Sequence, residues 1–480
     1  MNSGRTRSSL LGSGTRIRAG RGGVAILGAV VLCACALGPQ YQRPQIPVPS
    51  AWKNAPEDVA VSWPSPDWWR GFSSPQLDEY IGQAQRANDD IAAAVARVRE
   101  ADAQTQIVGA RLQPAIAASA VAARQRTLAS NGTRNTYTVY SPQISASYEL
   151  DFWGKNRAAL EAAQATLAAG RYDRATIELT VLSGVATTYF QALTLRERVE
   201  IAHRNLADAE SILNGLRSEQ KAGTVDALDV AQQETAVATL YASIPPLEQQ
   251  FHASVNALAI LLGKTPETVE LAGGTLGELA QPAVVPGLPS ELLARRPDVA
   301  EAEAQLIAAN ADIAQARAAF FPSIALTASG GFASTALSSV LNSANTVFSV
   351  AAALTQPIFQ GGALEGQTAF TRARYEELLA GYHKTVLSAL ANVEDSLVGV
   401  QQTGEQERRQ KEAVATARRA HEIAQARLNA GTINVLALLN TESALFAAED
   451  AMAQIELSHM QALVGLFNAL GGGWHEGMEQ

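Results

Sequence analysis

Apolar residues recur at helical spacing over two unusually long stretches, 154–222 and 362–430, and neither stretch contains a proline. In the first stretch, apolar residues lie seven positions apart: Val185, Ala192, Val199, Leu206 and Leu213. In the second stretch they follow in steps of four and three: Val386, Leu390, Val393, Leu397 and Val400. This heptad spacing predicts helices that each pack along a neighbouring helix, and a dimeric coiled coil is the simplest such arrangement. At about 1.5 Å per residue each helix would be roughly 100 Å long, far longer than a bilayer is thick.

Four other segments alternate with a period of two, which predicts strands at about 114–128, 138–151, 322–334 and 346–358. Apolar side chains occupy every second position: Ile144, Ala146, Tyr148, Ile324, Leu326, Ala328, Phe348, Val350, Ala352 and Leu354. Small or neutral residues lie between them: Gln143, Ser145, Ser147, Ser323, Thr327, Ser329, Ser349, Ala351, Ala353 and Thr355. A strand between lipid and a water-filled pore has this pattern, and so has a soluble sheet packed on a core. Because four strands cannot close a barrel, several chains would have to pool strands that cross a membrane.

The chain is also a tandem duplication. Residues that interrupt or cap structure recur with a separation of 208 positions: Asp90 and Asp298, Pro114 and Pro322, Gly154 and Gly362, Gly223 and Gly431, Gly263 and Gly471. We therefore predict a first repeat at 75–263, a linker rich in proline and glycine at 264–296, a second repeat at 297–471 and a tail at 472–480. The predicted fold class is mainly α with a small β part.

Each long helix is expected to end at a glycine turn, Gly223-Thr224 or Gly431-Thr432, after which a second helix returns along the first. Pro245 and Pro246 fall inside the first returning helix, where we expect them to kink or interrupt it.

The N-terminus has the features of a lipoprotein signal. Residues 1–34 contain five arginines and no acid, with an apolar run at 24–32 that is too short to span a bilayer. The sequence Leu32-Cys33-Ala34-Cys35 resembles a lipobox, which requires a small residue before the modified cysteine and so selects Cys35. A disulfide is the alternative, but its only partner, Cys33, would leave with the signal. We expect an N-acyl group and S-diacylglycerol on Cys35, and Ala36 in place of an aspartate favours the outer membrane.

The lipidated residues 35–74 are rich in proline and tryptophan, which predicts an extended strap over the body whose aromatic rings are buried. Without the five arginines of the signal, 32 basic residues face 46 acids, a net charge of −14. An acidic chain is a poor ligand for nucleic acid.

No motif predicts catalysis, a metal or a cofactor other than the covalent lipid. Gly263-Lys264-Thr265 lacks the earlier glycine of a P-loop, because position 258 is a leucine. The histidines show no ligand spacing and are expected on solvated helix surfaces. We therefore expect that the chain is not an enzyme.

Several motifs together resemble the lipoprotein branch of the TolC-like outer membrane efflux factors. They are the lipobox, Tyr41-Gln42-Arg43-Pro44, Trp68-Trp69, Leu150-Asp151-Phe152-Trp153-Gly154-Lys155, Ile244-Pro245-Pro246-Leu247-Glu248-Gln249-Gln250, Arg295-Arg296-Pro297-Asp298-Val299 and Phe320-Phe321-Pro322-Ser323. The resemblance implies a homotrimer in which four strands per chain make a 12-stranded transmembrane β-barrel and the long helices make a periplasmic α-barrel. It also implies two partners, a periplasmic adaptor protein and an inner-membrane pump of the RND type.

The resemblance further implies a tip that docks the adaptor and closes the channel. The docking residues would be Gly223, Thr224, Arg427, Gly431 and Thr432, although Glu219 replaces the matching arginine of the first turn. The aperture would be lined by Leu228, Asp229, Leu436 and Asn440, the last in place of the usual acid. The alternative is that the two leucines pack between helices and that Asp229 is a solvated acid.

Three functions remain open from the sequence. The favoured one is an outer membrane channel of a tripartite efflux system that passively conducts small molecules such as drugs and toxic compounds out of a Gram-negative cell. The alternatives are a duct for polypeptide export and a lipid-anchored periplasmic scaffold without a pore.

Overall fold

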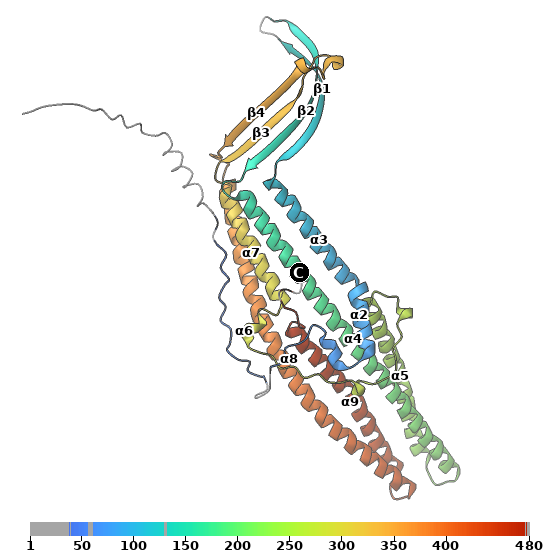
Figure 1. The fold of residues 1–480 in the computed structure, drawn as a ribbon. Coiled ribbons are helices and arrows are strands. Elements are labelled where there is room, and N and C mark those ends of the chain that lie inside the picture. The colour runs from blue at the N-terminus through green and yellow to red at the C-terminus, as the bar shows by residue number, and fades with distance from the viewer. Residues whose placement is uncertain (1–37, 39, 56–60, 129–131, 476, 478–480) are drawn as a thin grey trace, which may run out of the picture.

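The computed structural model describes residues 38, 40–55, 61–128, 132–475 and 477. The molecule is elongated, with a β-sheet at one end and two helical hairpins at the other (Figure 1). Two helices of 67 residues each, α4 (Lys155–Lys221) and α8 (Ala363–Asn429), connect the two ends. Each begins and ends one residue inside its predicted stretch.

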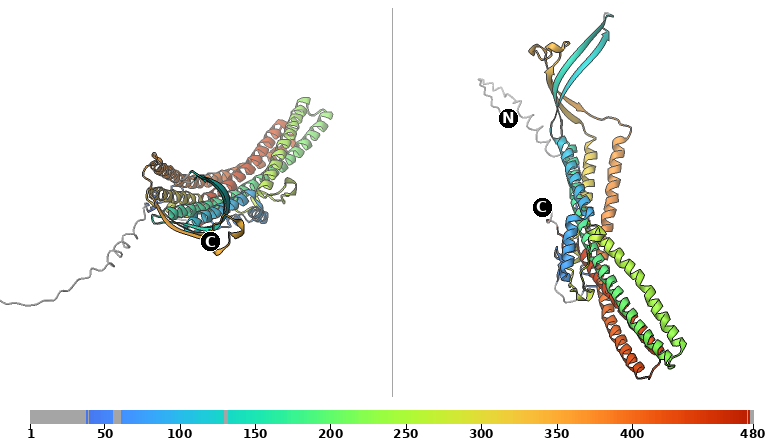
Figure 2. Two further views of the ribbon diagram at one scale, coloured as in Figure 1. Left: turned by 90° about the horizontal axis from the view of Figure 1, so that it is seen from above. Right: turned by 90° about the vertical axis from the view of Figure 1, so that its right-hand side faces the viewer.

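The remaining helices flank these two rods. On the sheet side of the middle, α3 (Asp89–Gly109), α4, α7 (Pro297–Ala318) and α8 lie side by side in that order. On the far side the order is α5 (Ala227–Leu261), α4, α9 (Val435–Ala469) and α8. Seen from above, the helices form a curved layer (Figure 2). Its two edges are α8 on one side and α3 with α5 on the other.

The predicted heptad positions face this packing. Val185 and Ala192 of α4, and Val386 and Val393 of α8, are fully buried. The buried residues form one large cluster of α4 with α2 (Pro75–Ala87), α5 and α9, and another of α8 with α7 and α9. The heptad residues of each rod therefore pack against helices of the same chain.

Each repeat has the same kind of junction at mid-length, where the end of one helix meets the start of another. In the first repeat, the side-chain amide of Asn88 donates to the carbonyl of Leu261 at 2.9 Å. In the second, the guanidinium of Arg296 donates to the carbonyl of Ala469 at 3.0 Å. The two pairs are 208 positions apart, so the duplication predicted from the landmarks extends to individual hydrogen bonds. At each junction a helix on the sheet side, α3 or α7, is stacked end to end on a helix on the tip side, α5 or α9. The continuous rod, α4 or α8, runs beside both.

Glycines at equivalent positions lie at the ends of both rods and of both returning helices. All six have positive φ angles, which residues with a side chain rarely adopt: Gly154, Gly362, Gly223, Gly431, Gly263 and Gly471. The residue types that revealed the repeat are thus the ones its turns require.

The strap and the linker cross the middle of the molecule. Trp52, Trp68 and Trp69 are buried, as predicted, whereas Trp63 is only half-buried. Trp68 stacks on Phe467 of α9 with ring centroids 5.1 Å apart. Among the described residues of the strap, η1 (Trp68–Phe72) is the only helix. The linker contains three more short helices: η3 (Pro266–Thr268), η4 (Leu276–Glu278) and α6 (Pro289–Leu292).

One prediction about the helices was wrong in part. Helix α5 is not interrupted, because it continues through Pro245 and Pro246 to Leu261. The two prolines lack the N–H groups that would bond the carbonyls of Tyr241 and Ala242. Both of those residues are exposed, so water can satisfy the carbonyls without a break in the helix.

The sheet has four antiparallel strands in the order β1-β2-β3-β4. They are β1 (Ala115–Leu128), β2 (Arg134–Leu150), β3 (Ser323–Phe332) and β4 (Thr346–Thr355). β2 begins four residues earlier than predicted, so the first loop is shorter. The short helices η2 (Ala110–Leu112), η5 (Leu337–Ser339) and η6 (Ser343–Asn345) precede β1 and lie in the second loop.

Candidate functional sites: sheet, helical tip and strap

The register of the sheet gathers the alternating residues onto two faces. One row across the four strands is apolar: Ile116, Ala146, Ala328 and Val350. The next row, on the opposite face, is small and mostly hydroxylated: Ala117, Ser145, Ser329 and Ser349. Leu354 pairs with Ile324 and Thr355 with Ser323, so these two neighbours also lie on opposite faces.

The apolar face has no core to cover it. Phe348 is 84% exposed and Val350 is 78% exposed, and the sheet stands clear of the helices in Figure 1. A contiguous apolar surface of this kind is unfavourable in water and suits hydrocarbon. β3 and β4 each have 10 residues, which matches the roughly 9–11 residues of a tilted transmembrane strand. This exposure excludes the soluble sheet packed on a core of its own chain.

The sheet is also open at both edges. Within the described residues, β1 pairs along its length only with β2, and β4 pairs only with β3. Open edges present unpaired N–H and C=O groups, which cannot remain so in hydrocarbon. A sheet in this position therefore needs further strands from other chains.

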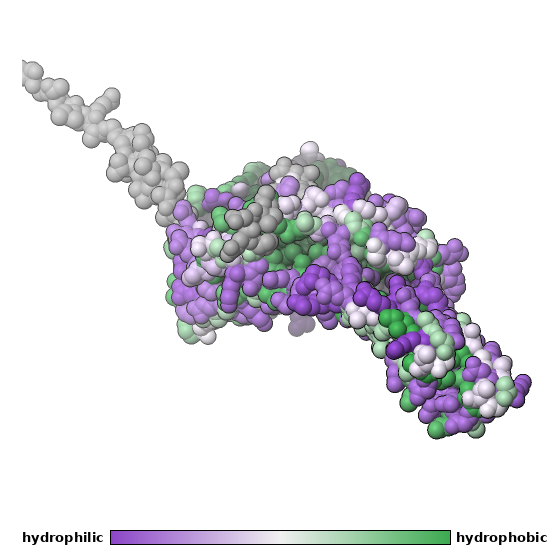
Figure 3. Space-filling view, turned by 90° about the horizontal axis from the view of Figure 1, so that it is seen from below, coloured by the Kyte–Doolittle hydropathy of each residue, from purple (hydrophilic) through white to green (hydrophobic). Residues whose placement is uncertain are grey.

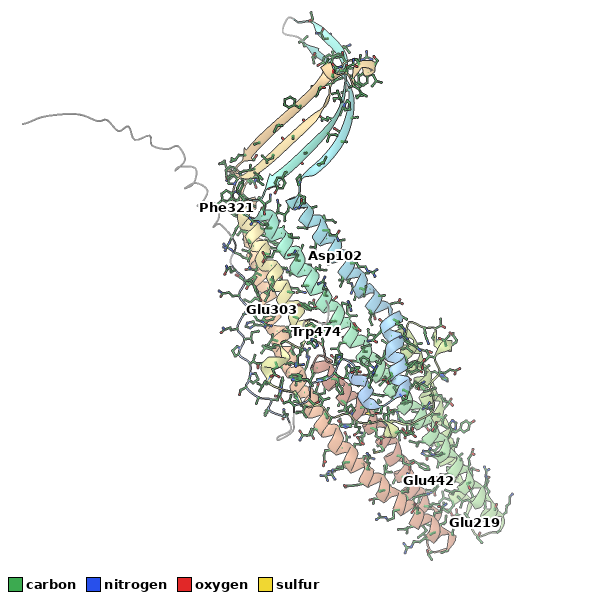
Figure 4. The ribbon with its side chains drawn as sticks, in the orientation of Figure 1. Asp102, Glu219, Glu303, Phe321, Glu442 and Trp474 are labelled. Atoms are coloured by element: carbon green, nitrogen blue, oxygen red, sulfur yellow. The ribbon has the colours of Figure 1, made fainter. Side chains whose placement is uncertain are left out.

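Aromatic residues surround the junction of sheet and helices. Trp153 stacks on Phe321 with centroids 4.9 Å apart and donates to the carbonyl of Pro322 at 2.7 Å. Figure 4 labels Phe321 at the foot of the sheet. Phe152 and Phe359 nearby are exposed. Aromatic rings at this level are typical of the boundary between membrane and water.

The two tip turns have the same hydrogen bonds. In the first, the N–H and hydroxyl of Thr224 both donate to the carbonyl of Glu219, at 3.1 and 2.9 Å. In the second, Thr432 makes both bonds to the carbonyl of Arg427, at 2.9 and 3.0 Å. Glu219 and Arg427 are therefore equivalent in backbone geometry and opposite in charge, and both are exposed.

The proposed aperture residues lie just past these turns. Leu228 is 63% exposed and Leu436 is 46% exposed, whereas Asp229 is half-buried and Asn440 is exposed. The packing core of the tip is formed by other residues: Leu213, Leu216, Val230 and Val435. Within one chain, therefore, Leu228 and Leu436 do not serve to hold the hairpins together.

Two capping residues of the tip were not singled out from the sequence. The carboxylate of Asp226 accepts from the N–H groups of Leu228 and Asp229, at 2.8 and 3.0 Å. In the second hairpin, Asn434 accepts from the N–H of Ala437 at 3.1 Å. The signal was present, since an Asp and an Asn 208 positions apart precede the returning helices, as N-caps do.

The strap runs along the second repeat toward the sheet. The guanidinium of Arg43 lies 2.7 Å from the carboxylate of Glu303 on α7, a residue that Figure 4 labels. Gly38 lies against Ala314, so close that a Cβ on the glycine would collide with it. Since α7 ends at Ala318 and β3 begins at Ser323, the first described residue of the strap lies near the foot of the sheet. Cys35 and the signal residues 1–34 are outside the described residues.

The helices offer neither a transmembrane span nor a metal centre among the described residues. No helix there is long and apolar enough to cross a membrane. No group of three or more His, Cys, Asp or Glu side chains in that part could hold a metal ion.

Comparison with known proteins gives consistent results. The family model for outer membrane efflux proteins matches residues 80–264 and 288–472, two segments separated by the same 208 positions. The pyoverdine export outer membrane protein OpmQ of Pseudomonas aeruginosa is 40% identical over 462 residues, which cover 94% of this chain and 96% of the relative. The probable outer membrane lipoprotein SilC of Salmonella typhimurium is 30% identical, with 93% and 97% covered.

Solved structures agree with the sequence relatives. The outer-membrane channel OprN superposes with a TM-score of 0.86 at 28% identity, over 92% of this chain and 100% of that chain. The open state of the Neisseria gonorrhoeae outer membrane channel MtrE has a TM-score of 0.84 at 29% identity, with 92% and 98% covered.

Proposed function

The chain belongs to the outer membrane efflux protein family, and on that basis we propose that it is the exit channel of a tripartite system that expels small molecules. The observation that carries the proposal is the four-stranded sheet, which exposes an apolar face and leaves both edges open. A periplasmic scaffold without a pore does not require such a sheet. OpmQ is named for the export of pyoverdine, a small molecule, which favours small-molecule cargo over polypeptides.

Three chains would complete what one leaves open. β4 of each chain would pair with β1 of the next, and three sets of four strands would give a 12-stranded barrel without edges. The helical layer ends at the matching edges, α8 on one side and α3 with α5 on the other. Exposed apolar residues lie on both edges: Leu387 and Ile423 on α8, Ile107 on α3 and Ile260 on α5. A homotrimer would bury these side chains between neighbouring chains, and their exposure in one chain supports the proposed α-barrel.

The covalent lipid would enter the membrane beside this barrel. Gly38 lies three residues after Cys35 and close to the foot of the sheet, and three extended residues reach about 10 Å. The acyl chains would therefore meet the periplasmic leaflet at the level of the aromatic residues, in keeping with the relative named as a lipoprotein.

The tip would meet the partners. We place a periplasmic adaptor at Gly223, Thr224, Arg427, Gly431 and Thr432, the exposed turns farthest from the sheet. The adaptor would connect the channel to an inner-membrane pump, of the RND type by resemblance. Leu228, Asp229, Leu436 and Asn440, just behind the turns, would narrow the channel there. Since Glu219 and Arg427 differ in charge at equivalent positions, the two turns would not bind the adaptor equally.

Conductance tests the proposal. Purified protein added to a planar lipid bilayer should produce discrete single-channel steps, because a closed barrel encloses a water-filled path. Protein with residues 115–150 deleted, and thus without β1 and β2, serves as the control and should produce none. If trimers from which proteolysis has removed the tip insert stably into the bilayer and still show no conductance, the scaffold would be favoured.

A further inference from the structure

A groove between the tip and the middle of the molecule has a chemistry that the channel does not explain. It lies over α4 and between α5 and α9, with a cavity of about 680 Å³. Its floor extends from Arg198 to Ala209 of α4, which is about 17 Å of helix. That volume is in the range of a site for a drug-sized ligand, roughly 300–1,000 Å³.

The groove joins the two repeats. One wall is α5 of the first repeat and the other is α9 of the second. Polar and apolar side chains alternate on both walls, and the large apolar ones are Leu240, Pro246, Leu247, Leu439 and Phe446. Figure 3, which looks from the tip end, shows hydrophobic residues among hydrophilic ones at the surface of the molecule. In the proposed trimer, neighbouring chains would attach at the edges of the layer, α5 on one side and α8 on the other. They would leave the groove between α5 and α9 uncovered.

Glu442 is the unexplained group in this lining. It is only 3% exposed, and its Oε1 atom is fully buried without a hydrogen-bond partner among the described residues. Figure 4 labels it on α9, between the middle of the molecule and the tip. A buried carboxylate that lacks partners costs free energy, which a ligand could recover.

The other charges of the lining compensate each other. Arg198 donates to both carboxylate oxygens of Asp450, at 2.6 and 3.2 Å. The remaining polar lining residues are neutral amides and hydroxyls. The groove therefore contains one carboxyl group without a compensating cation, among apolar side chains and neutral amides and hydroxyls. Phe446 lies one helical turn from Glu442 on the same face of α9. An aromatic ring beside a carboxylate favours a cation with an apolar body.

We propose that this groove is a binding site for drug-sized organic cations, with Glu442 as the counter-ion and the apolar side chains of α5 and α9 enclosing the body of the ligand. A bound molecule would contact both repeats at once, and so would link the two hairpins that lead to the tip. The role goes beyond passive conduction, because the ligand is held at a defined place on each chain.

The site should depend on pH. Burial, together with the negative charge of Asp208 on α4, raises the pKa of Glu442 to about 7. The other charged groups that face the groove are Arg198 and Asp450, which are paired, and α5 contributes no titratable lining residue. Because Glu442 is neutral below its pKa, affinity for a permanently charged cation should be present above pH 7 and decrease as the pH falls through about 7.

Two probes of equal size and opposite charge test the proposal. Tetraphenylphosphonium and tetraphenylborate are titrated into the purified full-length trimer by calorimetry at pH 8 and pH 6. We expect the cation to bind, more tightly at pH 8, and the anion not to bind. Equal binding of both probes would overturn the assignment of a charge-selective site.

Three variants locate the site. Glu442→Gln keeps the shape and removes the charge, and should weaken cation binding at least about tenfold, which corresponds to about 1.4 kcal/mol. Glu449→Gln removes the same charge from α9 outside the lining and should change affinity less than about twofold. Ser443→Trp, at a lining position, should abolish binding by occupying the groove. Unchanged affinity in Glu442→Gln, or in a correctly assembled Ser443→Trp trimer, would overturn the proposal.

The channel and the site are tested separately. Single-channel conductance of the same preparations shows whether the proposed exit channel is intact, and it requires no ligand. Cation binding without conductance would retain the site and contradict the channel, whereas conductance without binding would do the reverse.

Discussion

Arg296 and Asn88 occupy equivalent positions of the two repeats but close their junctions with different chemistry. Asn88 uses a neutral amide, which bonds Leu261 and also caps α3. Arg296 is buried, bonds the carbonyl of Ala469 and forms a bidentate pair with Asp298 at 2.9 and 2.6 Å. A buried arginine that serves a carboxylate and a helix C-terminus at once leaves both unsatisfied when it is removed.

We therefore expect unequal costs of mutation at the two junctions. Arg296→Gln should lower the free energy of unfolding by about 1.5–3 kcal/mol, the range for hydrogen bonds to charged groups. Asn88→Ala should cost about 1 kcal/mol, as for loss of an N-cap. The heat-induced loss of helical circular dichroism measures both. Equal midpoints for Arg296→Gln and the parent protein would mean that helix packing alone holds the second junction.

The function of Cys35 depends on a single atom, its Sγ. Cys35→Ser should abolish metabolic labelling with palmitate, since the thioether to diacylglycerol cannot form. Trimers should still assemble, because the strands rather than the acyl chains provide the spanning surface. Cys33→Ser is the matched control and should label normally. Labelling that persists in Cys35→Ser would refute the lipobox.

Leu354 and Thr355 test which face of the sheet meets lipid. Leu354 is 66% exposed on the apolar face and Thr355 lies on the other face. An arginine near mid-bilayer on a lipid-facing strand position costs about 2–4 kcal/mol, whereas one in the lumen stays hydrated. Leu354→Arg should therefore reduce the yield of heat-resistant trimer on gels far more than Thr355→Arg. If both variants assembled equally, the two faces would be assigned wrongly.

The bounds of individual helices and strands could be predicted wherever local sequence rules determine them. Heptads, period-two segments and capping glycines gave the bounds of α4 and α8 to within one residue, because a positive φ at Gly223 or Gly431 can be read from residue type. The prediction that Pro245 and Pro246 interrupt α5 was wrong because their effect depends on tertiary structure. It depends on whether water reaches the carbonyls one turn earlier.

Contacts between distant segments could not be predicted. Nothing in the sequence indicates that Arg43 meets Glu303, or that the groove over α4 isolates Glu442. The sequence shows Glu442 only as an acid within a largely apolar helix, and an acid on a solvated helix face looks the same. Cavities and long-range ion pairs depend on how elements pack, and the period of a single element does not encode that.

Substitutions at two glycines, one within α8 and one in the turn that follows it, should change stability in opposite directions. Gly431 has a φ of +67°, so Gly431→Ala should destabilise the turn by roughly 1–2 kcal/mol although no atom obstructs the new methyl group. Gly381 lies within α8, also with open space around it, and Gly381→Ala should stabilise by about 0.4–1 kcal/mol. Midpoints of thermal unfolding measure the difference. A stabilised Gly431→Ala would show that the turn changes conformation to accept the side chain.

At the scale of the whole molecule, one chain is an incomplete object. It is a curved layer with two open edges in both its sheet and its helices, so its stability cannot be separated from assembly. The number of chains is not written in the strand count, because barrels of several sizes could use four strands each. The number three comes from the family resemblance, whereas the open edges of one chain require neighbouring chains without fixing how many.

The aperture also depends on assembly, because three chains must bring their tips together. Leu228 and Leu436 are exposed in one chain, and if they meet at the axis, apolar contact would close the resting tip. Replacing both with serine should then weaken that contact and raise single-channel conductance. Val230→Ala is a control within the tip core and should lower stability, by about 0.5–2 kcal/mol, more than it changes conductance.

A substitution at Asp229 tests the charge of the aperture independently of its width. Three copies near the axis would repel anions and attract cations, so Asp229→Asn should reduce the preference for cations without widening the pore. Reversal potentials in a salt gradient measure selectivity, and step size measures width. The two phenotypes are separable because serine at Leu228 and Leu436 changes packing, while asparagine at Asp229 changes only charge. If the double serine variant conducts like the parent, the constriction is formed by other residues and the leucines have a different role in the trimer.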